Sequence, residues 1–220
     1  MNPKVFQAAS TGDSSYFESL IYPSSIHLQV TAGKNTVLHV ALQFKKFDAA
    51  KNIVNISPRL VYETNSKGNT PLHVAASVGD SSMVKLLIDQ AKLDVETGGR
   101  QQLLSMVNQD GDTALHVAVR YGNFEVVKEL IKGKDPAELA KHVNKEGESA
   151  LFLAVDRQDY VMAAHILSAA PDWSFAGRHG MNVLHALVIH TSSCKFCSTM
   201  LLKYFAHFFY IRMWSFRGVN

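Results

Sequence analysis

The chain repeats one short motif at nearly regular intervals. Residues 69–76 read Asn-Thr-Pro-Leu-His-Val-Ala-Ala, and residues 112–119 read Asp-Thr-Ala-Leu-His-Val-Ala-Val. Residues 35–42 and 148–155 are close variants, and residues 181–187 are a weaker fifth copy. The central leucines of the five copies are 34, 43, 36 and 33 residues apart. Self-similarity at such a period indicates a stack of small supersecondary units that bury their apolar faces against one another.

Each unit is expected to hold two helices after a tight turn. In the unit that begins near residue 110, Gly111 suits a turn because glycine reaches positive φ without steric cost. Thr113 is predicted to cap a short inner helix over residues 114–119. Gly122 is predicted to end that helix in a left-handed conformation, and residues 124–131 carry the apolar stripe of an outer helix.

The motif resembles the Thr-Pro-Leu-His-x-Ala pattern of ankyrin repeats over about residues 1–205. The resemblance implies an all-α ankyrin-repeat solenoid of stacked helix-turn-helix units with short hairpin-like turns. We expect a partial N-terminal unit over residues 1–30 and an aromatic and basic C-terminal tail over residues 206–220. Between them, units are expected to start near residues 34, 67, 110, 146 and 179.

Four histidines recur at one position of the motif, namely His39, His73, His116 and His185. By the same resemblance, each connects its capping residue to the backbone of a neighbouring loop. The alternative is a zinc site, whose ligands must all lie about 2.1 Å from one ion. Histidines that occur once per unit of a packed stack are too far apart for that, so we expect a structural role.

Several units depart from the pattern. Lys34 stands at a turn glycine, and Lys45 and Gln158 stand at the glycine between helices. Phe152 replaces the motif histidine in the fourth full unit. The longest interval carries an insertion over residues 92–108, which we expect to form a loop at one edge of the stack, where partners commonly bind.

Two strings narrow the resemblance. Residues 104–122 and 179–187 look like the plant ankyrin–transmembrane proteins of the accelerated-cell-death group. In that group a membrane domain that opens on Pro-Gly-Gly follows the repeats, and this sequence contains no Pro-Gly-Gly. The chain therefore resembles the soluble half of such a protein. The resemblance implies plant signalling or defence, in the cytoplasm or at the inner face of the plasma membrane.

Composition excludes several classes. A formal net charge of +3 over 220 residues is too small to indicate a nucleic-acid partner. Two cysteines provide no disulfide framework, which suits a reducing compartment. The N-terminus lacks an apolar run of signal-peptide length, and no window offers the roughly 18 uncharged apolar residues of a confident membrane span.

The candidate chemical sites are weak. Cys194 and Cys197 form a single Cys-x-x-Cys with His185 and His190 upstream, but a zinc site normally brings a second well-spaced pair. A redox role for that pair would need a preceding βαβ unit. Asp110 and Asp112 are close in sequence, yet a turn tip should leave them solvated. We therefore expect no enzyme activity, no cofactor and no metal.

The last residues allow two interpretations. Residues 196–220 contain eight aromatic side chains, and no acidic residue follows Asp172. An aromatic and basic segment can lie at an anionic membrane surface, which would give a peripheral membrane contact. Alternatively, residues 198–210 form the outer helix of the last unit at a truncated or mis-spliced end. The sequence leaves both open.

The predicted partner-binding surface is the concave face of the stack, built from turn tips and the exposed side of the inner helices. Carried over position by position, its residues are Lys67, Asn69, Ser77, Val78, Gln109, Asp112, Arg120, Tyr121, Lys145, Glu148, Asp156, Arg157, Arg178 and His179. Arg120 and Tyr121 are the preferred anchors because Arg and Tyr are enriched at interface hot spots. The charges on this face are of mixed sign, which favours a protein over a polyanion.

The sequence thus predicts a monomeric, non-catalytic protein-interaction module. Two alternatives remain: a fragment of a membrane-anchored ankyrin protein without independent function, and a metal-binding protein or enzyme.

Overall fold

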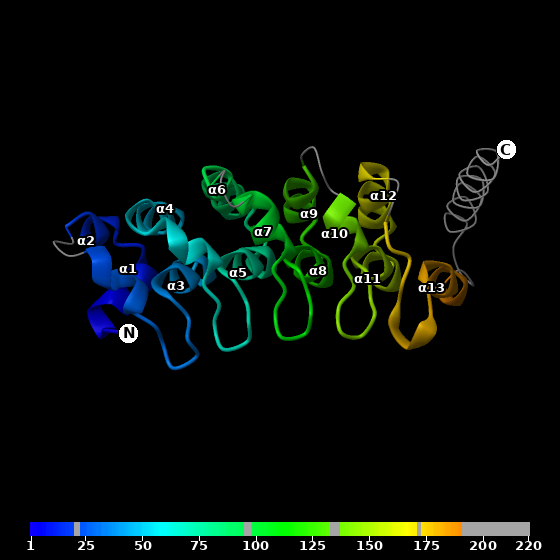
Figure 1. The fold of residues 1–220 in the computed structure, drawn as a ribbon, viewed down its shortest axis with the longest axis horizontal. Helices are drawn as coiled ribbons and strands as arrows, with labels where there is room; N and C mark the ends of the chain where they lie inside the picture. Colours follow the sequence, from blue (N-terminus) through cyan, green and yellow to red (C-terminus); the bar gives the residue numbers. More distant parts are fainter. Residues whose placement is uncertain (20–22, 95–97, 133–136, 171–172, 191–220) are drawn as a thin grey trace.

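The computed structural model describes residues 1–19, 23–94, 98–132, 137–170 and 173–190. Helices stack in one elongated row with two layers (Figure 1). The inner layer contains α1 (Pro3–Thr11), α3 (Val37–Gln43), α5 (Pro71–Val78), α8 (Ala114–Arg120), α11 (Ala150–Asp156) and α13 (Val183–His190). The outer layer contains α2 (Ser14–Glu18), α4 (Phe47–Ile56), α6 (Ser81–Lys92), α9 (Phe124–Ile131) and α12 (Tyr160–Ala169). The predicted all-α solenoid is confirmed.

Hairpin-like loops project along one side of the inner layer (Figure 1). Isolated antiparallel bridges close three of them, between Val30 and Thr36, Val143 and Ser149, and Ala176 and Asn182. Short 3₁₀ turns complete the connections: η1 (Pro23–Leu28), η2 (Pro58–Tyr62) and η3 (Arg178–Gly180). Inner helices pack against one another and against their outer partners. The core is therefore one continuous cluster of side chains, mainly Leu, Val and Ala, between the two layers.

Capping residues start the inner helices as the motif predicts. The side chains of Thr36, Thr70 and Thr113 each accept the backbone N–H of the histidine three positions later. Ser149 does the same for Phe152. A cap of this kind satisfies one of the free N–H groups at a helix start and stabilises the fold by about 1 kcal/mol.

The motif histidines join successive units. The ring Nδ1 of His39 accepts the N–H of Thr36 at 3.2 Å, so the neutral ring carries its proton on Nε2. That Nε2 donates to the carbonyl of Asn69 in the next loop at 2.9 Å. His73 and His116 repeat the arrangement, with the carbonyls of Asp112 at 2.9 Å and Glu148 at 3.2 Å. The predicted structural role of these three histidines is confirmed.

His185 shows half of this pattern. Its Nδ1 accepts the N–H of Asn182 at 3.2 Å, as in the other units. Its side chain is exposed, however, whereas His39, His73 and His116 are at most 1% exposed. Since the described part of the chain ends at residue 190, it contains no following loop carbonyl for this ring.

Asparagines five positions before the capping residue hold the loops, a role that the motif alone does not reveal. The Oδ1 atom of Asn108 accepts the backbone N–H groups of Asp110 and Asp112 at 2.9 and 3.0 Å. Its Nδ2 group donates to Oδ1 of Asn69 in the preceding loop at 3.0 Å. Asn65 and Asn144 have the same two functions.

The unit that lacks the motif histidine is closed differently. The Phe152 ring lies directly against Gly177, where even a Cβ atom would come within 2.2 Å of the ring. In the histidine-containing units the backbone N–H of the capping residue donates to the ring Nδ1. Here the N–H of the capping residue Ser149 donates instead to the carbonyl of Ala176 at 2.9 Å. The guanidinium of Arg178 lies 5.8 Å from the centre of the Phe152 ring.

Non-glycine residues occupy left-handed backbone positions where the repeat pattern has glycine. Lys34 and Lys45 have φ of 56°, and Gln158 has φ of 61°. Gly79 and Gly122, which take the place of Lys45 and Gln158 in their own units, have φ of 81° and 73°. These turns therefore keep the geometry of the fold without glycine, at a cost of about 1–2 kcal/mol each.

The insertion is not a simple loop, so that expectation is wrong. Within residues 92–108 the chain forms α7 (Gly99–Ser105), which packs against α6 and α10 (Ala137–Lys141) in the outer layer. Leu103 and Leu104 are buried there. Because burial of these two leucines is favourable, α7 packs into the outer layer as an additional helix.

The C-terminal tail, Cys194 and Cys197 lie outside the described residues. In the described part, every helix is too short or too polar to cross a bilayer.

Replacing Lys45 by glycine should stabilise the protein. Lys45 is exposed and left-handed, so Lys45→Gly removes backbone strain while the loss of side-chain contact is small. We expect the free energy of unfolding in urea to rise by about 1 kcal/mol. Lys51→Gly is the matched control, because exposed Lys51 lies inside α4 and glycine there should cost about 1 kcal/mol. A loss of stability in both variants would contradict the prediction.

Acid should weaken the stack through its buried histidines. Burial lowers the pKa of His39 and of His116 to about 4 and also lowers the pKa of His73. Since the unfolded value is near 6.5, the unfolded chain binds more protons between pH 6.5 and 4. Stability is therefore full above pH 6.5 and falls as pH falls toward 4, by about 2 kcal/mol between pH 7 and 5 for each of His39 and His116.

Urea unfolding at pH 7 and 5, followed by circular dichroism, measures this loss. His39→Gln should be less stable at pH 7 but show a smaller loss between the two pH values. Equal losses in the variant and the parent chain would rule out His39 as a source of the acid sensitivity.

Candidate functional site

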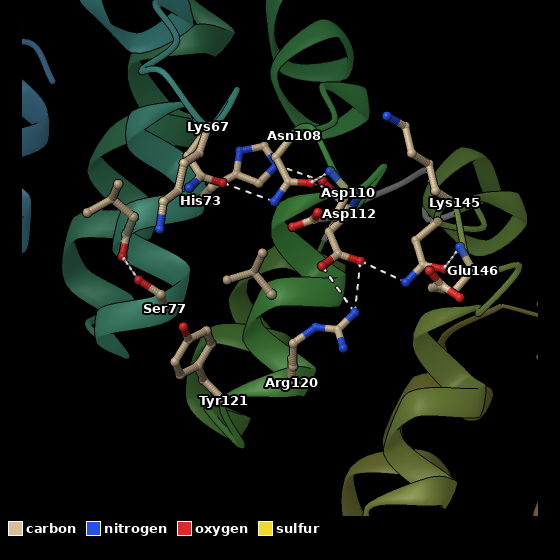
Figure 2. Close-up of a pocket in the computed structure, with 14 residues that line it drawn as sticks. Lys67, His73, Ser77, Asn108, Asp110, Asp112, Arg120, Tyr121, Lys145 and Glu146 are labelled. Atoms are coloured by element: carbon tan, nitrogen blue, oxygen red, sulfur yellow. Dashed lines mark hydrogen bonds and ion pairs between the residues drawn. The ribbon is translucent and has the colours of Figure 1, made fainter. Parts of the chain in front are cut away.

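An open groove of about 500 Å³ runs across the inner-helix side of the stack, from the loops before α5, α8 and α11 to the C-terminal ends of α5 and α8 (Figure 2). Half of its lining residues belong to the surface predicted from the sequence. These are Lys67, Asn69, Ser77, Asp112, Arg120, Tyr121 and Lys145. The groove thus brings together residues from three successive units.

The lining of the groove is mostly polar. Val74 and Val117 are aliphatic lining residues, four positions after the capping residues of α5 and α8. Lys67 and Lys145 are exposed on the loops at one margin, and Tyr121 stands at the opposite margin (Figure 2). Tyr121 is 63% exposed. A large, exposed aromatic side chain beside a groove can bury much area against a partner with little loss of conformational entropy.

Two carboxylates lie beneath the groove surface and are bridged by Asn144. Arg120 Nη2 lies 3.1 Å from Asp112 Oδ1 and 3.5 Å from Glu148 Oε2. Asn144 Nδ2 donates to Asp112 Oδ1 at 2.9 Å and to Glu148 Oε2 at 3.0 Å. The amide and the guanidinium together satisfy two acids from neighbouring units.

The ion pairs continue toward the C-terminus. Arg178 Nη1 donates to Glu148 Oε1 at 3.0 Å, and its Nη2 donates to Asp156 Oδ2 at 2.8 Å. His190 Nε2 lies 3.5 Å from Asp156 Oδ1. This ion-pair ladder, which consists of Asp112, Arg120, Glu148, Arg178 and Asp156, fixes the side chains of three units relative to one another.

The ladder keeps both arginines charged. Burial lowers the pKa of the Arg120 guanidinium, but hydrogen bonds and attraction from Asp112 and Glu148 together outweigh it and raise the pKa. For Arg178, burial again lowers the pKa, and the charges of Asp156 and Glu148 raise it overall. Arg120 is therefore a fixed, cationic part of the groove wall.

Two predicted contact residues are buried. The expectation that Asp112 is solvated is wrong, because the residue is 4% exposed and paired with Arg120. Glu148 is 2% exposed. Both face inward because Asn144 and the two arginines offer them hydrogen bonds. Asp110, in contrast, is exposed as expected.

The remaining predicted residues extend beyond the groove. Gln109, Arg157 and His179 are exposed, and Val78, Asp156 and Arg178 are half-buried. Arg157 Nη1 donates to the carbonyl of Arg120 at 2.7 Å, which ties the end of α8 to the next unit.

Sequence reasoning missed Asn144 and Phe44. Asn144 recurs at the same offset as Asn65 and Asn108, so its loop-holding role could have been found from the period. Phe44 stands eight positions after its capping residue, as Val78 and Tyr121 do. It is 47% exposed, so the first full unit also has an exposed aromatic residue at the position that Tyr121 takes in its own unit.

In the described part of the chain, no cluster of three or more His, Cys, Asp or Glu side chains could hold a metal ion. The groove contains fixed charges and polar tips, and its arrangement suits the holding of another molecule.

A stack of capped helix pairs with a concave polar groove defines a helical-repeat scaffold of the kind that binds other proteins. The chain belongs to the ankyrin-repeat family: the family model for ankyrin repeats (3 copies) matches residues 5–98 and 100–175. Ankyrin repeats are protein-interaction modules, and nothing in these comparisons points to an enzyme activity.

The chain is also similar to "Protein ACCELERATED CELL DEATH 6" of Arabidopsis thaliana. The two are 28% identical over 190 residues, which is 86% of this chain and 24% of that protein. The chain therefore spans about a quarter of the length of this curated relative.

Removing Arg120 should destabilise the stack. Arg120→Met keeps most of the side-chain volume but leaves Asp112 and Glu148 buried without their shared cation. We expect a loss of about 2 kcal/mol in urea unfolding, less than for a fully buried pair because the Arg120 side chain is 44% exposed. Lys145→Met, on the exposed loop beside it, should change stability by less than about 0.5 kcal/mol. Similar stabilities for both variants would show that the ladder contributes little.

Proposed function

We propose that the chain is a non-catalytic adaptor that holds a protein partner in its concave groove. The single observation that carries this proposal is the groove of about 500 Å³, which combines an exposed Tyr121, a charged Arg120 and exposed lysines at its margin. Tyrosine and arginine are enriched among the residues that dominate binding energy.

The groove is also preorganised. The ion-pair ladder fixes the Arg120 side chain. Hydrogen bonds from backbone N–H groups to Asn65 and Asn144 fix the loops that carry Lys67 and Lys145. A surface whose side chains are already ordered loses less conformational entropy when a partner binds. Its charges of both signs favour a partner with a matching charge pattern.

We further propose a role in plant signalling or defence, in the cytoplasm or at the inner face of the plasma membrane. The support is the similarity to an Arabidopsis thaliana protein whose name refers to accelerated cell death. Because the chain corresponds to about a quarter of that protein, the proposal concerns the binding module alone.

Proximity labelling in plant cells tests the binding role. The labelling enzyme is fused to the parent chain, to a Lys67→Glu/Tyr121→Ala variant and to a Lys85→Glu control. Lys85 is an exposed residue of α6 in the outer layer. We expect the groove variant to lose a specific set of labelled proteins by tenfold or more, because it removes an aromatic anchor and reverses a marginal charge.

The control should keep that set. Identical labelling by the parent chain, the groove variant and an unrelated protein would contradict an adaptor role. Fractionation of the same cells tests the location, and recovery confined to nuclei or to an organelle lumen would contradict the proposed placement.

A further inference from the structure

Near the N-terminus, two exposed aromatic side chains contact each other on the surface of the stack. Phe6 in α1 is 40% exposed and Phe44 at the end of α3 is 47% exposed. Their rings lie in an edge-to-face arrangement with centroids 6.3 Å apart. Two large aromatic side chains therefore contact each other at the surface, outside the buried core and outside the groove lining.

The repeat register places Phe44 on the groove side. Phe6 stands six positions before Gly12, as His73 and His116 stand before Gly79 and Gly122, and its ring contacts Phe44 of the next unit. Phe44 stands eight positions after Thr36, the register of Tyr121. Since α1 packs on α3 and α3 on α5 (Figure 1), the aromatic pair lies in the two units that precede the groove.

Positive charge accompanies the aromatic pair. The turn that follows Phe44 carries the exposed Lys45 and the half-buried Lys46. The corresponding turns of later units carry Asp80, Asn123 and Asp159. The first 60 positions hold six basic and three acidic residues, a net charge of +3, whereas residues 61–172 hold 11 basic and 16 acidic residues.

We propose that Phe6 and Phe44 form an anchor for an aromatic or large aliphatic side chain of a protein segment whose flanking residues are acidic. This inference rests on the proposed binding function and names the partner's chemistry at one end of the concave face. An edge-to-face pair leaves one ring face open, on which a third apolar side chain can stack. Lys45 then lies beside acidic residues of the same segment.

A membrane surface fits this site less well. Side chains that enter a bilayer need an apolar face that projects beyond the polar surface. More than half of the surface of Phe6 and of Phe44 is instead covered by surrounding residues, and Phe44 shares the register of Tyr121. A segment that lies along the groove can reach them without leaving the concave face.

A phage-displayed library of random peptides is the probe, panned on the purified full chain. We expect enriched peptides to carry an aromatic or large aliphatic residue next to Asp or Glu. Binding of a synthetic enriched peptide should weaken by roughly tenfold in Phe44→Ser and several-fold in Lys45→Glu. Lys85→Glu in the outer layer is the matched charge control and should bind like the parent chain.

Phe44→Leu guards against a folding defect, because it keeps an apolar side chain at the turn and should retain most of the binding. Circular dichroism melts of all variants show whether the stack is intact. If peptides bind Phe44→Ser as well as the parent chain but lose Tyr121→Ala, the inference is wrong while the groove still binds proteins. Absence of enriched peptides, or binding to anionic phosphatidylserine vesicles in their place, overturns the anchor.

Discussion

The hydrogen bond from each buried histidine to the carbonyl of the next loop holds this molecule together. In His39, His73 and His116 one ring nitrogen accepts from the capping residue's backbone and the other donates across the unit boundary. The bond that Nδ1 accepts requires a neutral ring, because protonation of Nδ1 would remove its lone pair. The helix start, the loop position and the spacing of units therefore depend on the same side chain.

The loops need a second set of bonds because a histidine reaches only one carbonyl. Asn65, Asn108 and Asn144 each satisfy two backbone N–H groups of their own loop and then donate to a side chain of the loop before. Asn65 and Asn108 donate to asparagine side chains, whereas Asn144 donates to the carboxylate of Asp112. The asparagine bonds between loops therefore connect to the ion-pair ladder at Asp112. The rigid polar wall of the groove is thus an extension of the bonds that stack the units.

This coupling explains why some residues predicted to meet a partner are hidden. Loop-tip acids are usually solvated, but Asp112 and Glu148 face an amide and two arginines from neighbouring units. Each arginine stays half-exposed while it neutralises two acids. The groove then presents the Arg120 guanidinium, whose orientation is set by buried carboxylates, and Tyr121 is exposed beside it.

The repeat motif by itself determined the fold class and the caps at Thr36, Thr70, Thr113 and Ser149, because these depend on spacing within a unit and on backbone geometry. The role of three histidines was implied by the resemblance of that motif to ankyrin repeats. The left-handed turns at Lys45 and Gln158 follow equally from the register, since the stack imposes the φ value even where glycine is absent.

Only the tertiary structure decided what the units do to one another. The burial of Asp112, the cross-unit bonds of Asn144, the packing of α7 on α10 and the contact between Phe6 and Phe44 all depend on residues from different parts of the chain. Such contacts depend on where neighbouring units place their side chains. A period in the sequence specifies each unit, but the electrostatics and shape of the concave face arise from the differences between units after they have stacked.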